Sequence, residues 1–347
     1  MARYTVEEVT VHPTTICTFE CAHCMYAASP SKGSEMAMDE VRGYLSQLPE
    51  LEVTWLGISG GEPTLFSGLD EMISYASDVR RETGYPKEIY MNTNGSCARD
   101  FDRTLARVRK WKEEGLDHLR ISNDKYHKKF DQREQIANFR KIRKYDGVPN
   151  IEFLPSDAIM PIGRARDRVP KREWDLNPPI DCPLMDLVLA DDRPSDYSRC
   201  LYIFPDGVYA CRGIGYIGKG RMTELIENAT KNPLFQVIAS IGVRRAVKAA
   251  REKMPANIRQ EARYLHECAL CFDVFNNEKV VAAMQSEAPR ILEIVEKEWQ
   301  EEMEREKIWH AKIDRIIDGA RSGKVLDEES KKEYDELKRR VLSLCTI

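Results

Sequence analysis

The sequence predicts an α/β fold in which parallel strands alternate with helices. Two features of roughly the first 155 residues support this prediction: short runs rich in β-branched residues, and helical apolar patterns between those runs. A repeated strand–helix order predicts a parallel sheet with helices packed outside it. An open doubly wound sheet and a barrel both satisfy this pattern.

The expected elements follow one another regularly. Strands are predicted at residues 9–12, 53–58, 88–91, 118–121 and 151–154. Helices are predicted between them at residues 38–48, 69–83, 101–114 and 130–145, and Gly115 is a typical C-cap for the third of these. Near the C-terminus, apolar residues from Ile291 to Ile317 recur mostly every three or four positions, which predicts an amphipathic helix. A further short helix is expected over residues 327–344.

The composition fits a protein with a sizeable core and no strong global charge. The chain has 347 residues, 42% of them apolar, and its net charge is −4. This balance argues against a nucleic-acid binder with a strong positive field. No apolar run approaches the length of a membrane span, and the N-terminus does not resemble a signal peptide, so we expect a cytoplasmic protein without membrane partners. In that reducing compartment its ten cysteines are expected to be metal ligands or catalytic thiols.

Three cysteines form a compact pattern directly after the first predicted strand. Cys17, Cys21 and Cys24 have the spacing Cys-x3-Cys-x2-Cys. Three thiolates can hold a 4Fe–4S cube and leave its fourth iron open, and an open position is typical of catalytic metal centres. A zinc site is the alternative, and it would need His23 as a fourth ligand.

The segment CTFECAHC at residues 17–24 resembles the signature of the radical S-adenosylmethionine (SAM) family. The resemblance implies a partial (β/α)6 TIM-like barrel over residues 9–165, SAM bound to a 4Fe–4S cluster, and a protein reductant such as flavodoxin or ferredoxin. It also implies reductive cleavage of SAM to a 5′-deoxyadenosyl radical, which abstracts hydrogen from a substrate. His23 stands where the family usually has an aromatic residue, and its ring could pack near the adenine.

Four further motifs follow successive predicted strands, and each resembles a SAM-binding element of the same family. Gly60-Gly61-Glu62-Pro63 resembles the segment that binds the SAM amino group. Asn94 belongs to a Thr-Asn-Gly ending, Ser122 and Asp124 form a Ser-x-Asp element, and Arg164 lies in a Gly-Arg-Ala element. We expect Arg164 to bind the SAM carboxylate or to support the structure near it. Because parallel strands end at one rim, all four motifs are expected to meet there.

A second group of cysteines lies downstream, at Cys182, Cys200, Cys211, Cys268 and Cys271. Cys268 and Cys271 form a Cys-x2-Cys pair, which is a common two-ligand clip. Strand-like runs flank Pro205-Asp206-Gly207, so a hairpin is expected there with Cys200 and Cys211 opposite each other.

This second region resembles the SPASM or twitch extension of radical SAM enzymes, which implies an auxiliary 4Fe–4S cluster. Five cysteines are one more than a single cluster needs, and the full seven-cysteine SPASM set is not present. We therefore expect one auxiliary cluster. A zinc site, which His266 could join, is the alternative. The expected domains are a radical SAM core at 1–165, an auxiliary-cluster domain at 166–285 and charged C-terminal helices at 286–347.

Three other residues are candidates for the reaction itself: Cys97 as a hydrogen-atom donor or substrate thiol, and Tyr126 and His127 as residues of the same cavity. Family members with such extensions often modify peptides or proteins, so a maturase acting on a peptide is the expected function. Oxidation or rearrangement of a small metabolite is the alternative within the family. An iron–sulfur electron carrier or a zinc-stabilised binding protein is the alternative outside it.

Overall fold

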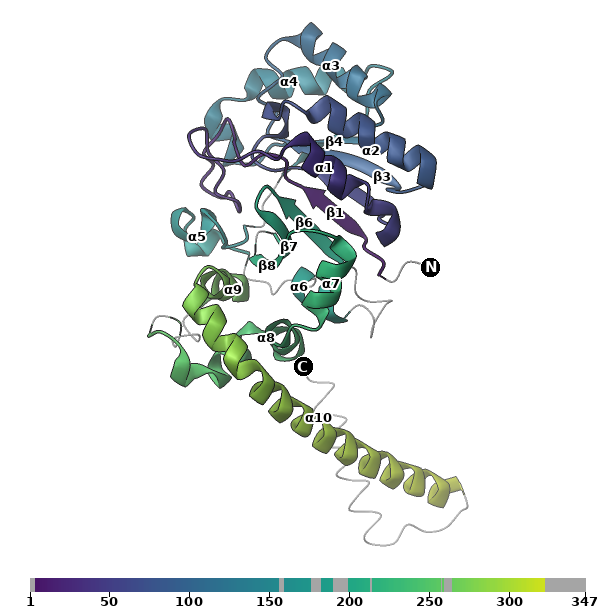
Figure 1. Ribbon diagram of the computed structural model, residues 1–347, viewed down its shortest axis with the longest axis vertical. Helices are drawn as coiled ribbons and strands as arrows, with labels where there is room; N and C mark the ends of the chain where they lie inside the picture. The colour runs from purple at the N-terminus through teal and green to yellow at the C-terminus, as the bar shows by residue number, and fades with distance from the viewer. Residues whose placement is uncertain are drawn as a thin grey trace. The chain divides into compact units, whose positions relative to one another are not determined.

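The computed structural model describes residues 4–155, 159–175, 182–189, 199–212, 214–256, 258 and 264–321. The chain forms two compact units, residues 1–289 and residues 290–347 (Figure 1). All of the residues that carry chemistry in the predictions above belong to the first unit.

The first unit is built on one sheet of eight strands in the order β5-β4-β3-β2-β1-β6-β7-β8. The strands are β1 (Glu8–Val11), β2 (Trp55–Ile58), β3 (Glu88–Thr93), β4 (His118–Ser122), β5 (Asn150–Leu154), β6 (Cys200–Phe204), β7 (Gly207–Cys211) and β8 (Ile214–Gly218). Strands β1 to β5 are parallel, and β6 joins β1 in the same direction. The α/β prediction and its five strands are thereby confirmed.

Two details differ from the expected barrel. Within residues 1–165 the described chain contributes five parallel strands rather than six, and the sixth parallel strand is β6, from the downstream cysteine region. The sheet then continues through the antiparallel hairpins β6–β7 and β7–β8. Strands β5 and β8 are its two edges, so the described strands do not close into a barrel.

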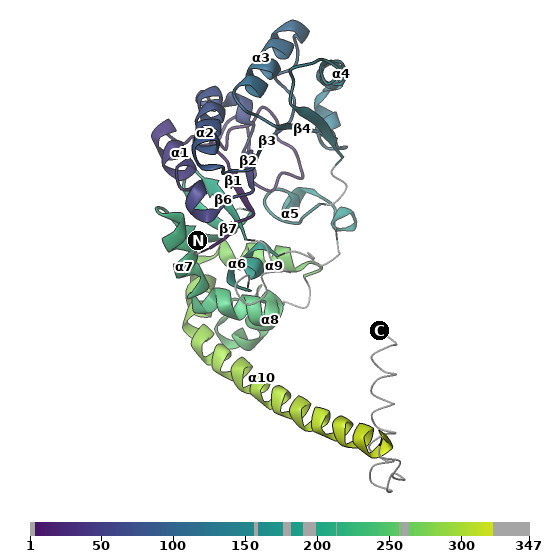
Figure 2. The ribbon, with the colours of Figure 1, turned by 90° about the vertical axis from the view of Figure 1, so that its right-hand side faces the viewer.

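Helices cover the outer face of the parallel strands. The first four are α1 (Met38–Leu45), α2 (Leu69–Thr83), α3 (Phe101–Glu113) and α4 (Arg133–Ile142), and Figure 2 shows α1 to α3 along one side of the sheet. The predicted helix at 130–145 begins later than expected because Asp131 has a left-handed backbone conformation that ends a preceding short turn. Gly84, also left-handed, ends α2 as a C-cap.

Successive side chains along the strands point alternately to an apolar outer face and to a more polar inner face. Val9, Val11, Leu56 and Ile58 are fully buried on the outer face. The residues between them include Thr10, which hydrogen bonds to Glu8 on the inner face. Burial of the outer face fixes the register, because a slip by one residue would turn every apolar side chain inward.

The remaining helices are α5 (Ala165–Arg168), α6 (Pro183–Leu189), α7 (Met222–Thr230), α8 (Pro233–Ala249), α9 (Glu267–Phe275) and α10 (Glu278–Arg321). The predicted C-terminal amphipathic helix is part of α10, which begins before Pro289 and runs through it. The helix predicted at 327–344, and Cys345, lie outside the described residues. Within the described part of the chain, no helix has the length and apolar content to cross a membrane.

Candidate active site at the ends of the parallel strands

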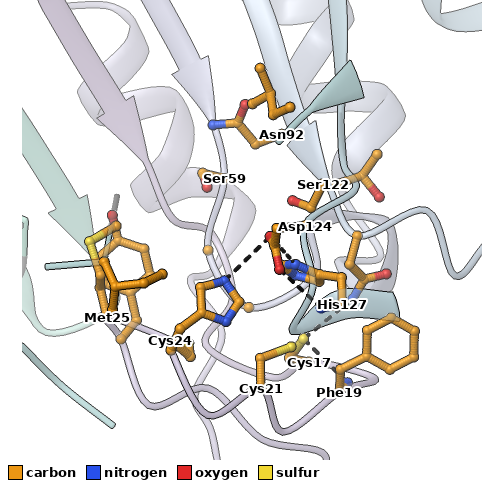
Figure 3. Close-up of a pocket in the computed structure, with 18 of the residues that line it drawn as sticks. Cys17, Phe19, Cys21, Cys24, Met25, Ser59, Asn92, Ser122, Asp124 and His127 are labelled. Carbon is orange, nitrogen blue, oxygen red and sulfur yellow. Dashed lines mark hydrogen bonds and ion pairs between the residues drawn. The ribbon is translucent and has the colours of Figure 1, made fainter. Parts of the chain in front are cut away.

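A pocket of about 270 Å³ lies where the parallel strands end. In Figure 3 the strand arrows point toward it. Its walls come from the loops that follow β1, β2, β3 and β4, which start on one rim because these strands are parallel. The predicted site residues on its lining are Cys17, Cys21, His23, Cys24, Gly60, Gly61, Asn94, Ser122, Asp124 and His127.

The three cysteines of the first group lie together in the loop after β1 (Figure 3). Burial raises the pKa of Cys17 to about 11. Burial, the neighbouring thiols Cys24 and Cys17, and Asp124 together raise the pKa of Cys21 to about 12. Three thiolates in this loop therefore need a cation beside them, and iron would supply one.

Two glycines allow the loop after β2 to lie against the cysteine loop. The backbone N–H of Gly61 donates to the carbonyl of Thr14 at 2.8 Å, and that of Glu62 donates to the carbonyl of Ile16 at 2.8 Å. A Cβ atom at Gly60 would lie 2.3 Å from the Thr14 carbonyl oxygen, and one at Gly61 would lie 2.0 Å from that of Ile16. The glycines are thus required by the close approach of two backbones.

Glu62 lies behind the pocket wall rather than on it, fully buried. Its carboxylate accepts hydrogen bonds from Thr64, from the Thr93 hydroxyl at 2.7 Å and from the Asn94 backbone N–H at 2.8 Å. Burial raises the pKa of Glu62 despite these hydrogen bonds. The carboxylate therefore fastens the end of β3 to the loop after β2. Pro63 is also buried behind the wall and begins a short 3₁₀ turn.

Asn94 connects the end of β3 to the cysteine loop. Its side-chain amide donates to the Thr18 hydroxyl at 2.9 Å and to the Cys17 sulfur at 3.5 Å. The side chain of Gln132 donates to its carbonyl oxygen. Asn94 thus orients a predicted metal ligand, and a hydrogen bond to a ligating sulfur is one means of tuning a cluster.

Asp124 organises two histidines at the end of β4. It accepts hydrogen bonds from the His127 ring at 2.6 Å and from the backbone N–H groups of Tyr126 and His127, and the His23 ring lies 3.5 Å away. Burial would raise the pKa of Asp124, but the contacts with His127 and His23 outweigh it and hold that pKa far below its usual range. The His23 ring stacks on Tyr126, with centroids 4.6 Å apart.

Cys21, His23 and His127 can present ligand atoms within 4.8 Å of one another, so this trio is compact enough for a single metal ion. Among the described residues it is the one set of three or more Cys, His, Asp or Glu side chains that is so compact. A zinc ion with 2.3 Å bonds to thiolates would hold its sulfurs about 3.8 Å apart. Cys17, Cys21 and Cys24 do not form such a set among the described residues, since their three sulfur atoms do not all lie within 4.8 Å of one another.

Arg164 lies outside the pocket lining and holds the cysteine loop by its backbone. Its guanidinium donates to the carbonyl of Cys21 at 2.9 Å and to that of Ala28, and its own N–H donates to the carbonyl of Cys24 at 2.9 Å. At the preceding Gly163, which has φ of +55°, an added Cβ would lie 1.9 Å from the Met25 carbonyl oxygen. The Gly-Arg pair therefore clamps the cysteine loop, and the expectation that Arg164 binds the SAM carboxylate or supports the structure near it stays a prediction.

Two of the candidates for the reaction lie away from the pocket lining. Cys97 is partly buried beside Glu62 and Thr64, and burial raises its pKa to about 12. Tyr126 packs behind His23, and its hydroxyl donates to Glu173 at 2.6 Å. His127 does line the pocket.

Several lining residues were not predicted from the sequence: Phe19, Met25, Tyr26, Ser59, Asn92, Thr93, Leu154, Ile159 and Met160. Ser59 directly follows β2, and Asn92 and Thr93 end β3, so strand-end position could have identified them. Met160 comes from a distant loop, and no local pattern marks it.

The second cysteine group gathers around the hairpin β6–β7 and helix α9. Cys200 and Cys211 lie across from each other at the same end of this antiparallel pair, as the register Tyr202↔Tyr209 requires. Burial and then the neighbouring thiol Cys182 raise the pKa of Cys268 to about 12. Burial followed by Cys182 and Cys268 raises the pKa of both Cys211 and Cys271. Cys182, Cys211, Cys268 and Cys271 thus lie within electrostatic reach of one another.

Residues 11–149 match the family model of the radical SAM superfamily. A GTP 3′,8-cyclase of Mannheimia succiniciproducens is 27% identical over 32% of this chain and 31% of its own length. A PqqA peptide cyclase of Bradyrhizobium diazoefficiens is 32% identical over 30% of this chain and 25% of its own length. The structure of BtrN in complex with AdoMet and 2-DOIA aligns over 76% of this chain and 99% of its own, with 16% identity and a TM-score of 0.41. The chain therefore spans a quarter to a third of the length of these curated relatives.

Proposed function

We propose that this chain is a radical SAM enzyme that modifies a peptide or protein, because residues 11–149 match the family model of the radical SAM superfamily. When bound, a 4Fe–4S cluster and SAM would supply a 5′-deoxyadenosyl radical for hydrogen abstraction from a substrate C–H bond. The observation that carries this proposal is the convergence of three thiols, two of them buried, with four strand-end loops on one pocket.

The residues of the chain would bind and orient these groups. Cys17, Cys21 and Cys24 would hold the cluster, and Asn94 would hydrogen bond to the sulfur of Cys17. The exposed backbone of Gly60 and Gly61 on the pocket wall would face the amino end of SAM. Glu62 and Arg164 would act indirectly, by fixing the loops that carry these ligands.

A groove beside the pocket favours an extended substrate such as a peptide. Phe19 lines both the pocket and a neighbouring groove of about 660 Å³. Its ring stacks on that of the exposed Phe130, with centroids 4.5 Å apart. A peptide could place one side chain in the pocket while its backbone follows the groove over these rings. A relative named as a peptide cyclase agrees with this substrate class. The relatives that act on GTP keep a small-molecule substrate as the second candidate.

The downstream cysteines would hold one auxiliary 4Fe–4S cluster within residues 166–285. Cys182, Cys268 and Cys271 would supply three ligands, and Cys211 is better supported than Cys200 as the fourth because it interacts with all three of the others. Iron content tests this choice. Cys211→Ala should lose the auxiliary iron, whereas Cys200→Ala should keep it, and the reverse result would assign Cys200. Zinc in place of iron in the wild-type protein would contradict an auxiliary cluster.

The test of the central proposal is SAM cleavage. The protein would be reconstituted without oxygen, reduced with dithionite, mixed with SAM and assayed for 5′-deoxyadenosine. We expect product from the wild type and from Cys97→Ala, a matched loss of a thiol outside the pocket lining, but not from Cys21→Ala. A physiological reductant such as flavodoxin or ferredoxin should replace dithionite. Equal product from Cys21→Ala would refute the proposal. A wild-type protein that binds a single zinc ion and no SAM would favour the zinc-stabilised binding protein.

A further inference from the structure

Helix α4 carries a basic hollow that lies outside the pocket. The hollow has a volume of about 260 Å³ and is lined by Asn123, Lys128, Gln132, Arg133, Ile136 and Arg140. Residues 125–144, which include α4, hold eight lysines and arginines and two acidic residues, whereas the whole chain has a net charge of −4. A locally positive hollow on an otherwise slightly acidic protein is suited to an anionic partner.

Two of the three cations of the hollow have no acidic partner within the part of the chain that the structure describes. Arg133 pairs with Asp131, whose carboxylate lies 2.8 Å from the guanidinium. Lys128 and Arg140 are exposed and make no ion pair with a described residue, and the Arg140 guanidinium lies over the Phe153 ring, 5.7 Å from its centroid. Both charges can therefore pair with a ligand from outside the chain.

The cations are spaced for an extended chain rather than for one compact anion. Arg133, Ile136 and Arg140 lie on one face of α4, because they are three and four positions apart. Seven residues of helix separate the two arginines by about 10 Å along the axis. An extended peptide covers that distance in about three residues. Ile136 is 7% exposed and forms an apolar floor between the arginines. The hollow thus matches two acidic side chains of one segment with an apolar side chain between them.

The floor of the hollow also contains a buried amide. Gln132 is 3% exposed, and its side-chain nitrogen donates to the carbonyl oxygen of Asn94. Its side-chain oxygen is buried and has no hydrogen-bond partner among the described residues. A buried acceptor without a partner is costly, so a donor supplied by a ligand would stabilise it. Backbone N–H groups of a peptide are such donors, whereas carboxylates and phosphates by themselves are acceptors.

The hollow is connected to the pocket through the groove beside Phe19. Arg133 lines both the hollow and the groove, and Phe19 lines both the groove and the pocket. A chain that leaves the pocket over the rings of Phe19 and Phe130 therefore reaches Arg133 next, at the start of α4. One extended ligand could occupy the pocket, the groove and the hollow together.

We infer that this hollow binds an acidic segment of the peptide substrate, with its carboxylates at Lys128, Arg133 and Arg140. The residue to be modified would lie in the pocket, and the acidic segment would hold the rest of the chain against α4. The inference rests on the proposed function for the peptide substrate. Binding is measured without SAM or reductant, so a failure of SAM cleavage leaves this test intact, and a failure of binding leaves the test of SAM cleavage intact.

The experiment is fluorescence anisotropy of a short labelled peptide titrated with the reconstituted full-length protein. The probe carries two glutamates about three positions apart with leucine between them, and glutamine replaces both glutamates in the comparison peptide. We expect the glutamate peptide to bind about fivefold or more tightly at low salt, and added salt to weaken its binding more than that of the glutamine peptide. Arg133→Gln combined with Arg140→Gln should remove this preference.

A matched pair of substitutions controls for the loss of charge. Arg81→Gln combined with Lys231→Gln removes two cations that are 74% and 69% exposed and lie outside the hollow, and the preference for the glutamate peptide should remain. Urea unfolding of every variant detects misfolding, and Arg133→Lys combined with Arg140→Lys retains the charge and should retain the preference.

The inference is overturned if the two peptides bind equally to the wild type, if the preference survives in the Arg133→Gln and Arg140→Gln double variant, or if the control variant loses it. Equal binding of the two peptides, together with binding of GTP that this double variant loses, would assign the hollow to a phosphate group instead.

Discussion

Replacement of Arg164 by methionine tests whether the cysteine loop depends on a clamp outside the pocket. The Arg164 side chain is 7% exposed and donates two hydrogen bonds, to the carbonyl oxygens of Cys21 and Ala28. Hydrogen bonds from a charged donor contribute about 1.5–3 kcal/mol each, which gives about 3–6 kcal/mol for the pair. Methionine has a similar length and no charge to desolvate, so we expect a net loss of about 2–4 kcal/mol in the stability of this loop.

The assay is urea unfolding of the iron-free protein together with the rate of iron loss to a chelator from the reconstituted protein. The second measurement is needed because a loop can open without global unfolding. Arg168→Met is the matched control, since Arg168 is 54% exposed and makes an ion pair with Glu20. Exposed pairs contribute at most about 1 kcal/mol. If Arg164→Met loses iron no faster than Arg168→Met, and unfolds at the same urea concentration, Arg164 does not clamp the cysteine loop.

Three further predictions concern single positions. Gly61→Ala should lower the free energy of unfolding by about 3 kcal/mol or more and reduce iron content, because its Cβ would lie 2.0 Å from the Ile16 carbonyl oxygen. Gly43→Ala should instead stabilise by about 0.5–1 kcal/mol in denaturant unfolding, since it lies in α1 with no atom within 4 Å of the new Cβ. Asp124→Asn should be less stable than wild type at pH 7. In the wild type, the folded-state pKa of Asp124 is depressed below the unfolded value of about 3.9. The difference in stability between wild type and variant should therefore shrink as the pH falls from about 5 to 3, measured by thermal unfolding of iron-free protein. A difference that does not depend on pH would argue against the contact with His127.

Parallel topology explains how much of the site was predictable. Once the strand–helix alternation was identified, residues directly after each strand had to meet on one rim. Asn94, Ser122 and Asp124 were named from their resemblance to family motifs, and their position after successive strands predicted that they meet on this rim, where they line the pocket. The five parallel strands were predictable for the same reason, since their buried faces give apolar runs that local sequence reveals.

Long-range contacts explain what was not predictable. Glu62 was expected in the segment that binds the SAM amino group, and Arg164 either at the SAM carboxylate or in support of the structure near it. The structure gives them hydrogen-bond partners among the backbone and hydroxyl groups of other loops. The sequence alone does not show whether a charged side chain binds a ligand or forms hydrogen bonds with the backbone of another loop. The pairing of β6 with β1 was equally hidden, because these strands are separated by most of the first unit in sequence. A hairpin signal predicts its own turn but not the sheet edge that it joins.

The pairing of β6 with β1 bears on why the chain has two cysteine groups. Glu8, the first residue of β1, is level with Cys200, the first residue of β6. Cys211 is at the same end as Cys200, because β7 returns antiparallel to β6. The first cysteine group follows the opposite end of β1, beyond Val11. Four residues at about 3.3 Å each separate the two ends by roughly 10 Å. Thiolates on one 4Fe–4S cube cannot span both ends, so a single cluster cannot take ligands from both groups.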